Sequence, residues 1–291
     1  MPRPLTVNVA LVPALVPADP SVLLRSTFIV VDVVRATTTL SVLFERGCER
    51  VFVASGIAAA RVAHADLGRE RLLAGESGGV APEGFDLGNS PTEIAGRDMR
   101  STEVIFATTN GTRALRTCMG GHAVFAGALR NATAVAKAAV AAAHHIPSML
   151  GVDASNTGGA SEALGADYSA DITIVCSGRA GNPSYDDTIC AGYLVAALER
   201  AAREAGTDCR PLEQARIAAD LLRYATGSAT IYEALKNSDA GQAVAAVGLG
   251  DDLEYCAAID ASAAVPMLEG TYADTDLLMM SDARSMQPRD A

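Results

Sequence analysis

The sequence Thr27-Phe-Ile-Val-Val-Asp32 is an apolar, β-branched run that ends in an acidic residue. Such a run is typical of a strand that is buried on both faces of a sheet. The residues that follow, through Leu40 to Arg46, fit a helix packed on that strand. A buried strand followed at once by a helix is the repeating unit of an α/β protein.

The same unit recurs along the chain. The further predicted strands lie at 51–53, 103–108, 123–126 and 171–176, and the helices that follow them at 57–66, 112–118, 132–144 and 187–205. Val7, Val9 and Leu11 alternate as in a first strand, which favours a strand over a signal peptide there. After residue 207 the pattern is mostly helical, most clearly at 212–224. The sequence therefore predicts an α/β fold with helices covering a sheet.

The domain organisation follows from length and from one weakly periodic segment. At roughly 150 residues per domain, 291 residues suggest about two domains. Residues 149–170 are rich in Gly, Ser and Ala, which indicates a linker or an insertion. We expect an N-terminal α/β lobe over 1–148 and a C-terminal α/β lobe over 171–291. Residues 281–291 are polar and are expected to fray.

Composition and charge exclude several classes of protein. A hydrophobic fraction of 49% allows a sizeable core, and a net charge of -11 without a basic run argues against binding nucleic acid or a membrane surface. No stretch reaches the roughly 18 continuous apolar residues of a membrane span. The six cysteines form no Cys-x-x-Cys pair, as expected of free thiols in a reducing cytoplasm. We expect a cytoplasmic protein that is at least a dimer, as many α/β enzymes are.

Two loops after predicted strands carry polar residues that open helices. Asp32, Arg35, Thr37 and Thr38 follow the first strand, and Thr108-Thr109-Asn110-Gly111-Thr112 follows the strand at 103–107. Ligands of open α/β sheets bind at the carboxyl ends of strands, and helix amino ends offer free amides to anions. The two loops together predict a phosphate or carboxylate site, although either set of Thr and Asn residues alone could simply cap its helix.

A third segment is rich in glycine and contains Glu76, Asp86 and Asn89. It reads Gly75-Glu76-Ser-Gly-Gly79 and then Gly84-Phe-Asp86-Leu-Gly-Asn89-Ser-Pro91. Glycine lets a backbone approach a ligand closely, so this segment is a candidate part of the site. By composition alone it could equally be an ordinary long turn.

A fourth segment, Cys176-Ser177-Gly178-Arg179, ends a predicted strand, and Asp186 and Asp187 open the next helix. These acids could complement the helix dipole, or they could hold Mg²⁺ through one or two carboxylates and waters. The candidate metal-binding or acid/base carboxylates are Asp32, Glu76 and Asp186, with Asp187 as the alternate for Asp186. Cys176 is interpreted as a buried strand-end thiol.

Known catalytic and cofactor motifs are missing from the sequence. The four histidines lack zinc-type spacing, and no dinucleotide fingerprint, P-loop or Gly-x-Ser-x-Gly string occurs. The candidate residues of the four segments are rich in oxygen ligands and include no histidine. This combination suits a hard cation and a small anionic, phosphorylated substrate.

Taken in order, the four segments resemble the 2-phosphosulfolactate phosphatase family over about residues 5 to 265. The strings that carry the resemblance are Asp32-Val-Val-Arg35-Ala-Thr-Thr-Thr, Gly75-Glu76, Glu83-Gly-Phe-Asp-Leu-Gly-Asn-Ser-Pro91, Thr108-Thr-Asn-Gly-Thr112 and Cys190-Ala-Gly192. The resemblance implies an Mg²⁺-dependent hydrolase that converts (2R)-2-phospho-3-sulfolactate to 3-sulfolactate and phosphate, a step on a route to coenzyme M. It also implies two three-layer α/β/α lobes with the active site in the cleft between them.

The chain departs from the family pattern in three places, one of which is Cys176-Ser-Gly178, where the family usually has Cys-Ala-Gly. Residues 149–170 look like an insertion, and Ser238-Asp-Ala240-Gly241 stands where the family carries Ser-x-His-Gly. Two alternatives therefore stay open: a phosphatase for another small phosphorylated hydroxy acid, and a non-catalytic anion-binding homologue. Arg179 and Arg113 are candidates for binding a second anionic group of a substrate.

The candidate catalytic residues are Asp32, Arg35, Glu76 and Asp186. The candidate substrate-binding residues are Thr37, Thr38, Asp86, Asn89, Thr108, Thr109, Asn110, Gly111, Thr112, Ser177, Gly178 and Arg179. Hydrolysis could proceed by direct attack of water or through a phosphorylated Asp32. Because Val33 and Val34 follow Asp32, no second acid stands beside it, which favours direct attack of water.

Overall fold

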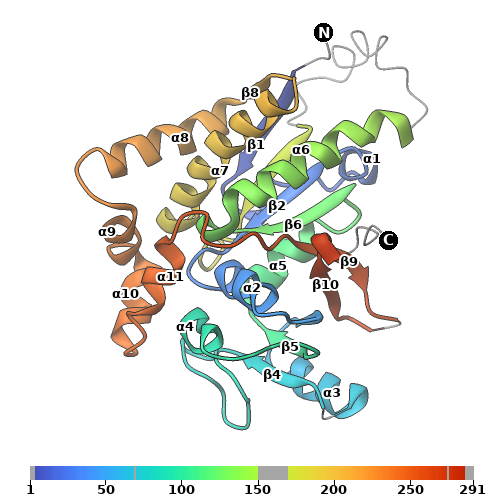
Figure 1. Cartoon of the computed structure of the whole chain (residues 1–291), viewed down its shortest axis with the longest axis vertical. Coiled ribbons are helices and arrows are strands. Elements are labelled where there is room, and N and C mark those ends of the chain that lie inside the picture. The colour runs from blue at the N-terminus through green and yellow to red at the C-terminus, as the bar shows by residue number, and fades with distance from the viewer. Residues whose placement is uncertain (1–3, 69, 150–169, 274, 286–291) are drawn as a thin grey trace.

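The computed structural model describes residues 4–68, 70–149, 170–273 and 275–285. Its described strands form one ten-stranded sheet in the order β4-β5-β3-β10-β9-β6-β2-β7-β1-β8 (Figure 1). The strands are β1 (Leu5–Ala10), β2 (Thr27–Val31), β3 (Arg50–Ala54), β4 (Leu72–Gly75), β5 (Glu103–Ala107), β6 (Ala123–Gly127), β7 (Ile172–Cys176), β8 (Cys209–Pro211), β9 (Pro266–Thr271) and β10 (Leu278–Asp282).

The sheet consists of two groups of parallel strands joined by an antiparallel hairpin. One group is β4, β5 and β3, and the other is β6, β2, β7, β1 and β8. The hairpin β9–β10 pairs antiparallel with β6 on one side and with β3 on the other. The larger group combines strands from before and after residues 149–170, so the sheet itself does not divide there. The division into lobes at that segment stays a prediction, and residues 150–169 lie outside the described part.

Helices cover the sheet on both faces. The helices are α1 (Pro20–Leu23), α2 (Ala36–Glu45), α3 (Ile57–Leu67), α4 (Pro91–Ala95), α5 (Asn110–Thr117), α6 (Ala132–Met149), α7 (Tyr185–Glu204), α8 (Glu213–Thr226), α9 (Ile231–Lys236), α10 (Asp239–Ala246) and α11 (Asp252–Ala257). Figure 1 shows α6, α7 and α8 lying together over β1, β2 and β7. No helix in the described ranges is long and apolar enough to cross a membrane.

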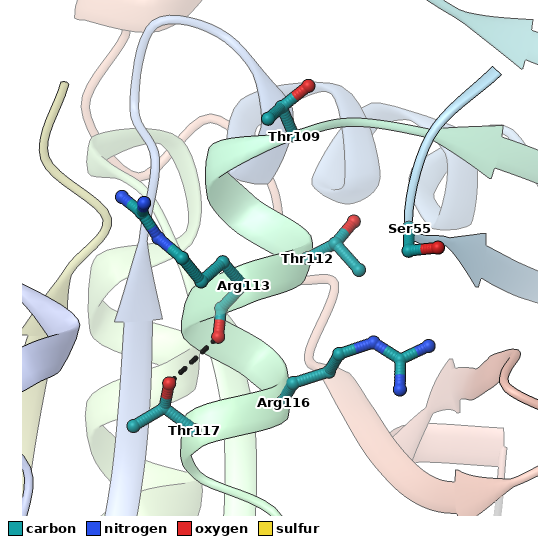
Figure 2. Close-up of a pocket in the computed structure, with 6 residues that line it drawn as sticks. All are labelled: Ser55, Thr109, Thr112, Arg113, Arg116 and Thr117. Atoms are coloured by element: carbon teal, nitrogen blue, oxygen red, sulfur yellow. Dashed lines mark hydrogen bonds between the residues drawn. The ribbon is translucent and has the colours of Figure 1, made fainter. Parts of the chain in front are cut away.

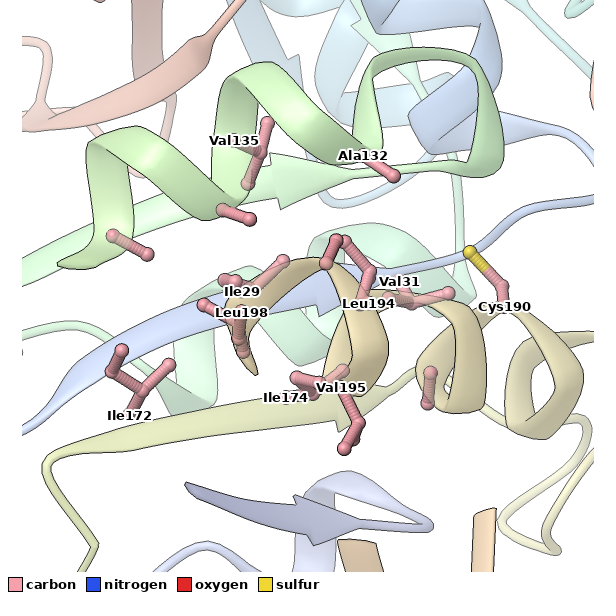
Figure 3. Close-up of a cluster of buried hydrophobic side chains, with 14 of the residues drawn as sticks. Ile29, Val31, Ala132, Val135, Ile172, Ile174, Cys190, Leu194, Val195 and Leu198 are labelled. Carbon is pink, nitrogen blue, oxygen red and sulfur yellow. The ribbon is translucent and has the colours of Figure 1, made fainter. Parts of the chain in front are cut away.

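The alternation of side chains in β2 separates two hydrophobic cores. Ile29 and Val31 face the core under α6 and α7, where Leu194 and Leu198 of α7 pack against them (Figure 3). Phe28 and Val30 face the other core, which Leu40 of α2 helps to fill. Because both faces of β2 are buried, its carboxyl end is held rigidly and the loop after it starts from a fixed point.

The structure confirms the predicted α/β fold class and each of the predicted strands, but it corrects the C-terminal part. The sequence predicted mostly helix after residue 207, whereas β9 and β10 form a hairpin that completes the sheet. Ser281 and Asp282 were expected to fray, yet both are buried in β10. Both pair with β9, opposite Met267 and Pro266, a pairing that their polar side chains did not indicate. Residues 286–291 lie outside the described part.

Candidate active site

The carboxyl ends of strands from both parallel groups meet at one place. Arg35 lies after β2, and its Nη2 donates a hydrogen bond to the carbonyl of Gly79, after β4, over 2.6 Å. The amide of Ser177, after β7, donates to the carbonyl of Val31 in β2 over 2.8 Å. A Cβ added at Gly111, after β5, would lie 3.1 Å from Asp32 Oδ2. The four segments singled out in the sequence therefore come together.

Four carboxylates interact electrostatically here, and we call them the acidic cluster: Asp32, Glu76, Asp186 and Asp187. Burial, the charge of Asp187 and the charge of Glu76 raise the pKa of Asp32 to about 7. Burial and the charges of Asp187 and Asp32 raise the pKa of Asp186 well above its usual value. The structure thus brings together the three carboxylates chosen from the sequence, and Asp187 belongs with them rather than replacing Asp186.

Asp187 is fixed by backbone amides of two strand-end loops. Its Oδ1 accepts from the amide of Val33 and its Oδ2 from the amide of Gly178, both over 3.0 Å. Burial raises the pKa of Asp187 to about 6, although these amides favour its charged form. Gly178 has a φ of +63°, and a Cβ there would lie 2.4 Å from the carbonyl oxygen of Asn182. This position therefore needs glycine.

Asp32 lies at the amino ends of two helices. The amides of Ala36 in α2 and Gly111 in α5 bind its carboxylate and oppose the rise of its pKa. Helix amino ends stabilise negative charge, so these contacts hold the carboxylate in place. The anion-binding ends predicted from the sequence thus already carry a protein carboxylate.

Arg35 is buried in an ion pair that the sequence did not reveal. Its Nη1 lies 2.7 Å from Oδ2 of Asp252 in α11. The other oxygen of Asp252 accepts from Ser90 Oγ over 2.6 Å and from the amide of Thr92 over 3.3 Å. Two of the five donors of Arg35 are therefore engaged with Asp252 and Gly79.

The threonines proposed for substrate binding make local contacts. Thr37 Oγ1 accepts from the amide of Asp32, and Thr38 Oγ1 donates to the carbonyl of Val33. Thr112 Oγ1 donates to the carbonyls of Thr108 and Ala54. These hydroxyls shape the loops. Thr109 is exposed and Asn110 half-buried at the start of α5.

The glycine-rich segment places its polar residues in three different settings. Glu76 Oε2 accepts from the amide of Gly79 over 2.8 Å, which fixes this carboxylate in the acidic cluster. Asp86 is exposed and accepts from the amide of Leu73 in β4 over 2.8 Å, so it supports the sheet edge. Asn89 is buried, and its Oδ1 has no hydrogen-bond partner among the described residues. Ser177 is fully buried, and its Oγ likewise has no hydrogen-bond partner among the described residues.

A cavity of about 240 Å³ adjoins the acidic cluster. Its lining includes Asp186 and Ser184 at the start of α7, exposed Arg179, and Ser238 and Ala240 at the start of α10. The positive charge of Arg179 partly offsets the rise in the pKa of Asp186. Nη1 of Arg179 donates a hydrogen bond to the carbonyl of Asp239 over 3.3 Å. The cavity therefore places one cation, Arg179, beside the acidic cluster, with Ala240 in the same lining.

A second cavity of about 330 Å³ lies along α5 (Figure 2). Thr112 and Arg116 extend toward Ser55, after β3, whereas Arg113 extends from the other side of the helix. Arg116 is paired with Asp276, its Nη1 lying 3.7 Å from Oδ1. Of the two arginines proposed for a second anion, Arg179 is thus the one that shares a cavity with the acidic cluster.

The donors present can be compared with the needs of Mg²⁺. In the part of the chain that the structure describes, no three His, Cys, Asp or Glu side chains are arranged to enclose a metal ion. Mg²⁺, however, keeps several waters and is held by one or two carboxylates together with substrate phosphates. The acidic cluster supplies carboxylates, and a cation would relieve the repulsion between its buried like charges. The residues present therefore fit an ion bound in that way.

The fold and this site are those of an α/β enzyme with an acidic, histidine-poor active site. A family model described as 2-phosphosulpholactate phosphatase matches residues 12–271. The chain belongs to the 2-phosphosulfolactate phosphatase family, a family of phosphoric monoester hydrolases. This confirms the family and the enzyme class expected from the sequence.

Curated relatives agree with this assignment. A probable 2-phosphosulfolactate phosphatase of Deinococcus radiodurans is 35% identical, over 82% of this chain and 86% of the relative. The one of Thermus thermophilus is 34% identical over 83% and 87%, and that of Gloeobacter violaceus 32% over 82% and 86%.

Sequence reasoning missed Asp252 and gave Asp187 only a secondary place. Asp252 follows another acid at the start of a short helix, a pattern that by itself indicates only a favourable interaction with the helix dipole. Its partner Arg35 lies 217 positions away. The residue pair Asp186-Asp187 was visible, but no local signal showed that both carboxylates are buried.

Proposed function

We propose that this chain is an Mg²⁺-dependent phosphatase that hydrolyses (2R)-2-phospho-3-sulfolactate to 3-sulfolactate and phosphate. The observation that carries the proposal is the acidic cluster at the meeting point of the strand ends. The names of the relatives from Deinococcus radiodurans and Thermus thermophilus supply the substrate.

One or two of Asp32, Glu76 and Asp186 would hold Mg²⁺, together with waters and the substrate phosphate. When bound, the ion would neutralise phosphate oxygens and lower the pKa of a coordinated water. The carboxylates would also orient the attacking water, and one of them would accept its proton as general base. The raised pKa values in this cluster suit a group that exchanges protons near neutral pH.

The phosphoryl group would lie between the acidic cluster and the loop Thr108–Thr112. Asn89 Oδ1 and Ser177 Oγ support a polar ligand here, because buried polar atoms without partners are rare in folded proteins. A serine hydroxyl can donate to a phosphate oxygen, whereas Asn89 Oδ1 accepts and could bind a water or a hydroxyl group of the ligand. Both residues are therefore substrate-binding candidates of equal standing with the loop.

The cavity at Arg179 would take the second anionic group of the substrate. A sulfonate or carboxylate needs a cationic or amide partner of its own, and Arg179 supplies the guanidinium beside Asp186. Arg35 is less suited to this task because Asp252 and Gly79 already engage its fork.

One observation favours a second candidate substrate class. Ala240 lines the Arg179 cavity with a single methyl group and offers no hydrogen bond to a bound group. A phosphorylated hydroxy acid with a substituent other than sulfonate could therefore occupy the same cavity. Under this alternative the reaction is unchanged, and only the second group of the substrate differs.

The test is a phosphate-release screen over small phosphorylated acids, with Mg²⁺ and with EDTA. The proposal expects fastest release from 2-phospho-3-sulfolactate, a loss of activity in EDTA and a loss in Asp32→Asn. Glu213→Gln, an exposed acid on α8, is the matched control and should keep full activity. Faster release from another acid would favour the second candidate. Binding of the acids without release of phosphate would identify a non-catalytic homologue.

A further inference from the structure

We infer that Asp252 is a positioning residue of the active site, which acts through Arg35 to hold Glu76 in the acidic cluster. The inference rests on the proposed function, because it assigns Asp252 a part in the same site. Asp252 lies in α11, far along the chain from each of the four segments that form the site.

A continuous set of contacts leads from Asp252 to Glu76. Asp252 Oδ2 binds Nη1 of Arg35 over 2.7 Å, and Nη2 of Arg35 donates to the carbonyl of Gly79 over 2.6 Å. The amide of Gly79 in turn donates to Oε2 of Glu76 over 2.8 Å. Both backbone groups of Gly79 are therefore held, its carbonyl by Arg35 and its amide by Glu76.

The environment of Asp252 makes this connection rigid. The side chains of Arg35 and Asp252 are only 3% and 1% exposed, so water cannot replace either partner. The second oxygen of Asp252 is fixed by Ser90 Oγ and the amide of Thr92 at the start of α4. Because both oxygens of Asp252 are bound, the guanidinium of Arg35 is held in one orientation. Because the guanidinium is planar, its Nη2 is then fixed toward the carbonyl of Gly79.

Gly79 itself depends on this arrangement. It has a φ of +90°, and an added Cβ would lie 3.2 Å from Cγ2 of Val247 and 3.9 Å from Nη2 of Arg35. The loop after β4 thus fits closely between Arg35 and Val247, which precedes α11. If the ion pair were lost, the carbonyl of Gly79 would lose its charged donor, and the loop that carries Glu76 would be free to move.

The test compares Asp252→Asn with Glu103→Gln. The control removes a carboxylate that binds Arg71 over 2.7 Å at the amino end of β5, the end of the strand opposite the site. We expect hydrogen exchange of the Gly79 amide to accelerate in Asp252→Asn and to stay unchanged in Glu103→Gln. We also expect the Mg²⁺ concentration for half-maximal activity to rise by about 10- to 100-fold, with the KM for the phosphorylated substrate unchanged. A purely structural role would lower the fraction of active enzyme without moving the Mg²⁺ requirement.

Ser90→Ala provides a second variant should Asp252→Asn fail to fold. It keeps the ion pair but removes the donor to Asp252, and Thr230→Ala, which removes the N-cap of α9, is its control. Faster Gly79 exchange and a higher Mg²⁺ requirement in Ser90→Ala alone would support the inference. Unchanged Gly79 exchange in the folded Asp252 or Ser90 variant would overturn it. Should no phosphatase activity be found in any variant, the proposed function fails, and the exchange measurement still decides whether Asp252 holds the loop.

Discussion

Arg35 and Asp252 form a buried ion pair between residues 217 positions apart, with 2.7 Å between Nη1 and Oδ2. Arg35 follows the central strand β2, whereas Asp252 begins α11 near the C-terminal end of the described chain. This pair ties a peripheral helix to the centre of the site. The sequence suggested that the guanidinium of Arg35 contacts phosphate. In the structure this guanidinium is bound by Asp252 instead.

The first prediction concerns the stability of the Arg35→Lys variant. Lysine keeps the charge but lacks the planar fork whose two Nη atoms reach Asp252 and Gly79, so we expect one charge-assisted hydrogen bond to be lost. We expect the free energy of unfolding, measured in urea, to fall by about 1.5–3 kcal/mol. The control is Arg216→Lys, because Arg216 forms an exposed ion pair with Glu213 on α8. This variant should change the free energy of unfolding by less than about 0.5 kcal/mol. Unchanged stability with a large loss of rate would show that Arg35 acts on the substrate instead.

Local sequence patterns mark the ends of several strands at the site but not its long-range contacts. The loops after β2, β5 and β7 could be located because a buried apolar run marks where each strand ends, whereas the loop after β4 stood out only by its glycines. Asp252 and the hairpin β9–β10 could not. The importance of Asp252 depends on a distant partner, and Leu278–Asp282 has neither alternation nor a β-branched run, so only its pairing with β3 and β9 makes it a strand.

The second prediction tests the close contact between Gly111 and Asp32. A Cβ at position 111 would lie 3.1 Å from Asp32 Oδ2 and 3.3 Å from the Cβ of Ala36, so the carboxylate would have to shift. We expect Gly111→Ala to lower kcat/KM by about 10- to 100-fold with the fold retained, because small misplacements of reacting groups are costly. Gly250→Ala is the control, since its Cβ would meet nothing closer than 4.0 Å. Wild-type activity in Gly111→Ala would mean that the position of Asp32 is not critical.

The third prediction is a pH dependence of stability in the metal-free protein. The pKa values of Asp32 and Asp187 are raised to about 7 and about 6 from 3.8. The native state therefore binds more protons than the unfolded state between about pH 4 and pH 7, and stability falls as the pH rises through this range. In EDTA, the thermal unfolding temperature Tm should be lower at about pH 7.5 than at about pH 5. Asp187→Asn should reduce this dependence of Tm on pH.

Mg²⁺ and a matched acid provide the controls for this measurement. Mg²⁺ should stabilise the protein more at the higher pH, because there it does not compete with protons for the carboxylates. Asp98→Asn should leave the slope unchanged, because Arg100 lowers the pKa of exposed Asp98 to about 2, outside the range measured. A wild-type stability that rises with pH between 5 and 7.5 would contradict the acidic cluster described above.

The fourth prediction concerns the cysteines. Burial raises the pKa of the Cys48 thiol and of the half-buried Cys209 thiol to about 12, and raises those of Cys118, Cys176, Cys190 and Cys256 as well. The thiolate is the reactive form, so at neutral pH none of the six should react quickly with a thiol reagent. Labelling should proceed first at Cys209, the one that is not fully buried, and should reach six per chain only after unfolding. Rapid labelling of Cys176 in the native protein would revive it as a nucleophile.

The last prediction concerns which group attacks phosphorus. Asp32 could attack directly, but the amides of Ala36 and Gly111 bind its carboxylate, and Gly111 leaves little room for it to move. These hydrogen bonds hold the carboxylate in place and occupy its lone pairs, whereas its raised pKa suits it to accept a proton from water. We therefore expect water to attack in one step, with inversion at a phosphorus atom made chiral by isotopic labelling. A phosphorylated Asp32 would instead give two displacements and net retention. Acid-quenched single turnovers examined by mass spectrometry provide the second readout. No phosphate adduct should appear on the peptide that contains Asp32, and finding one there, together with retention, would overturn direct attack.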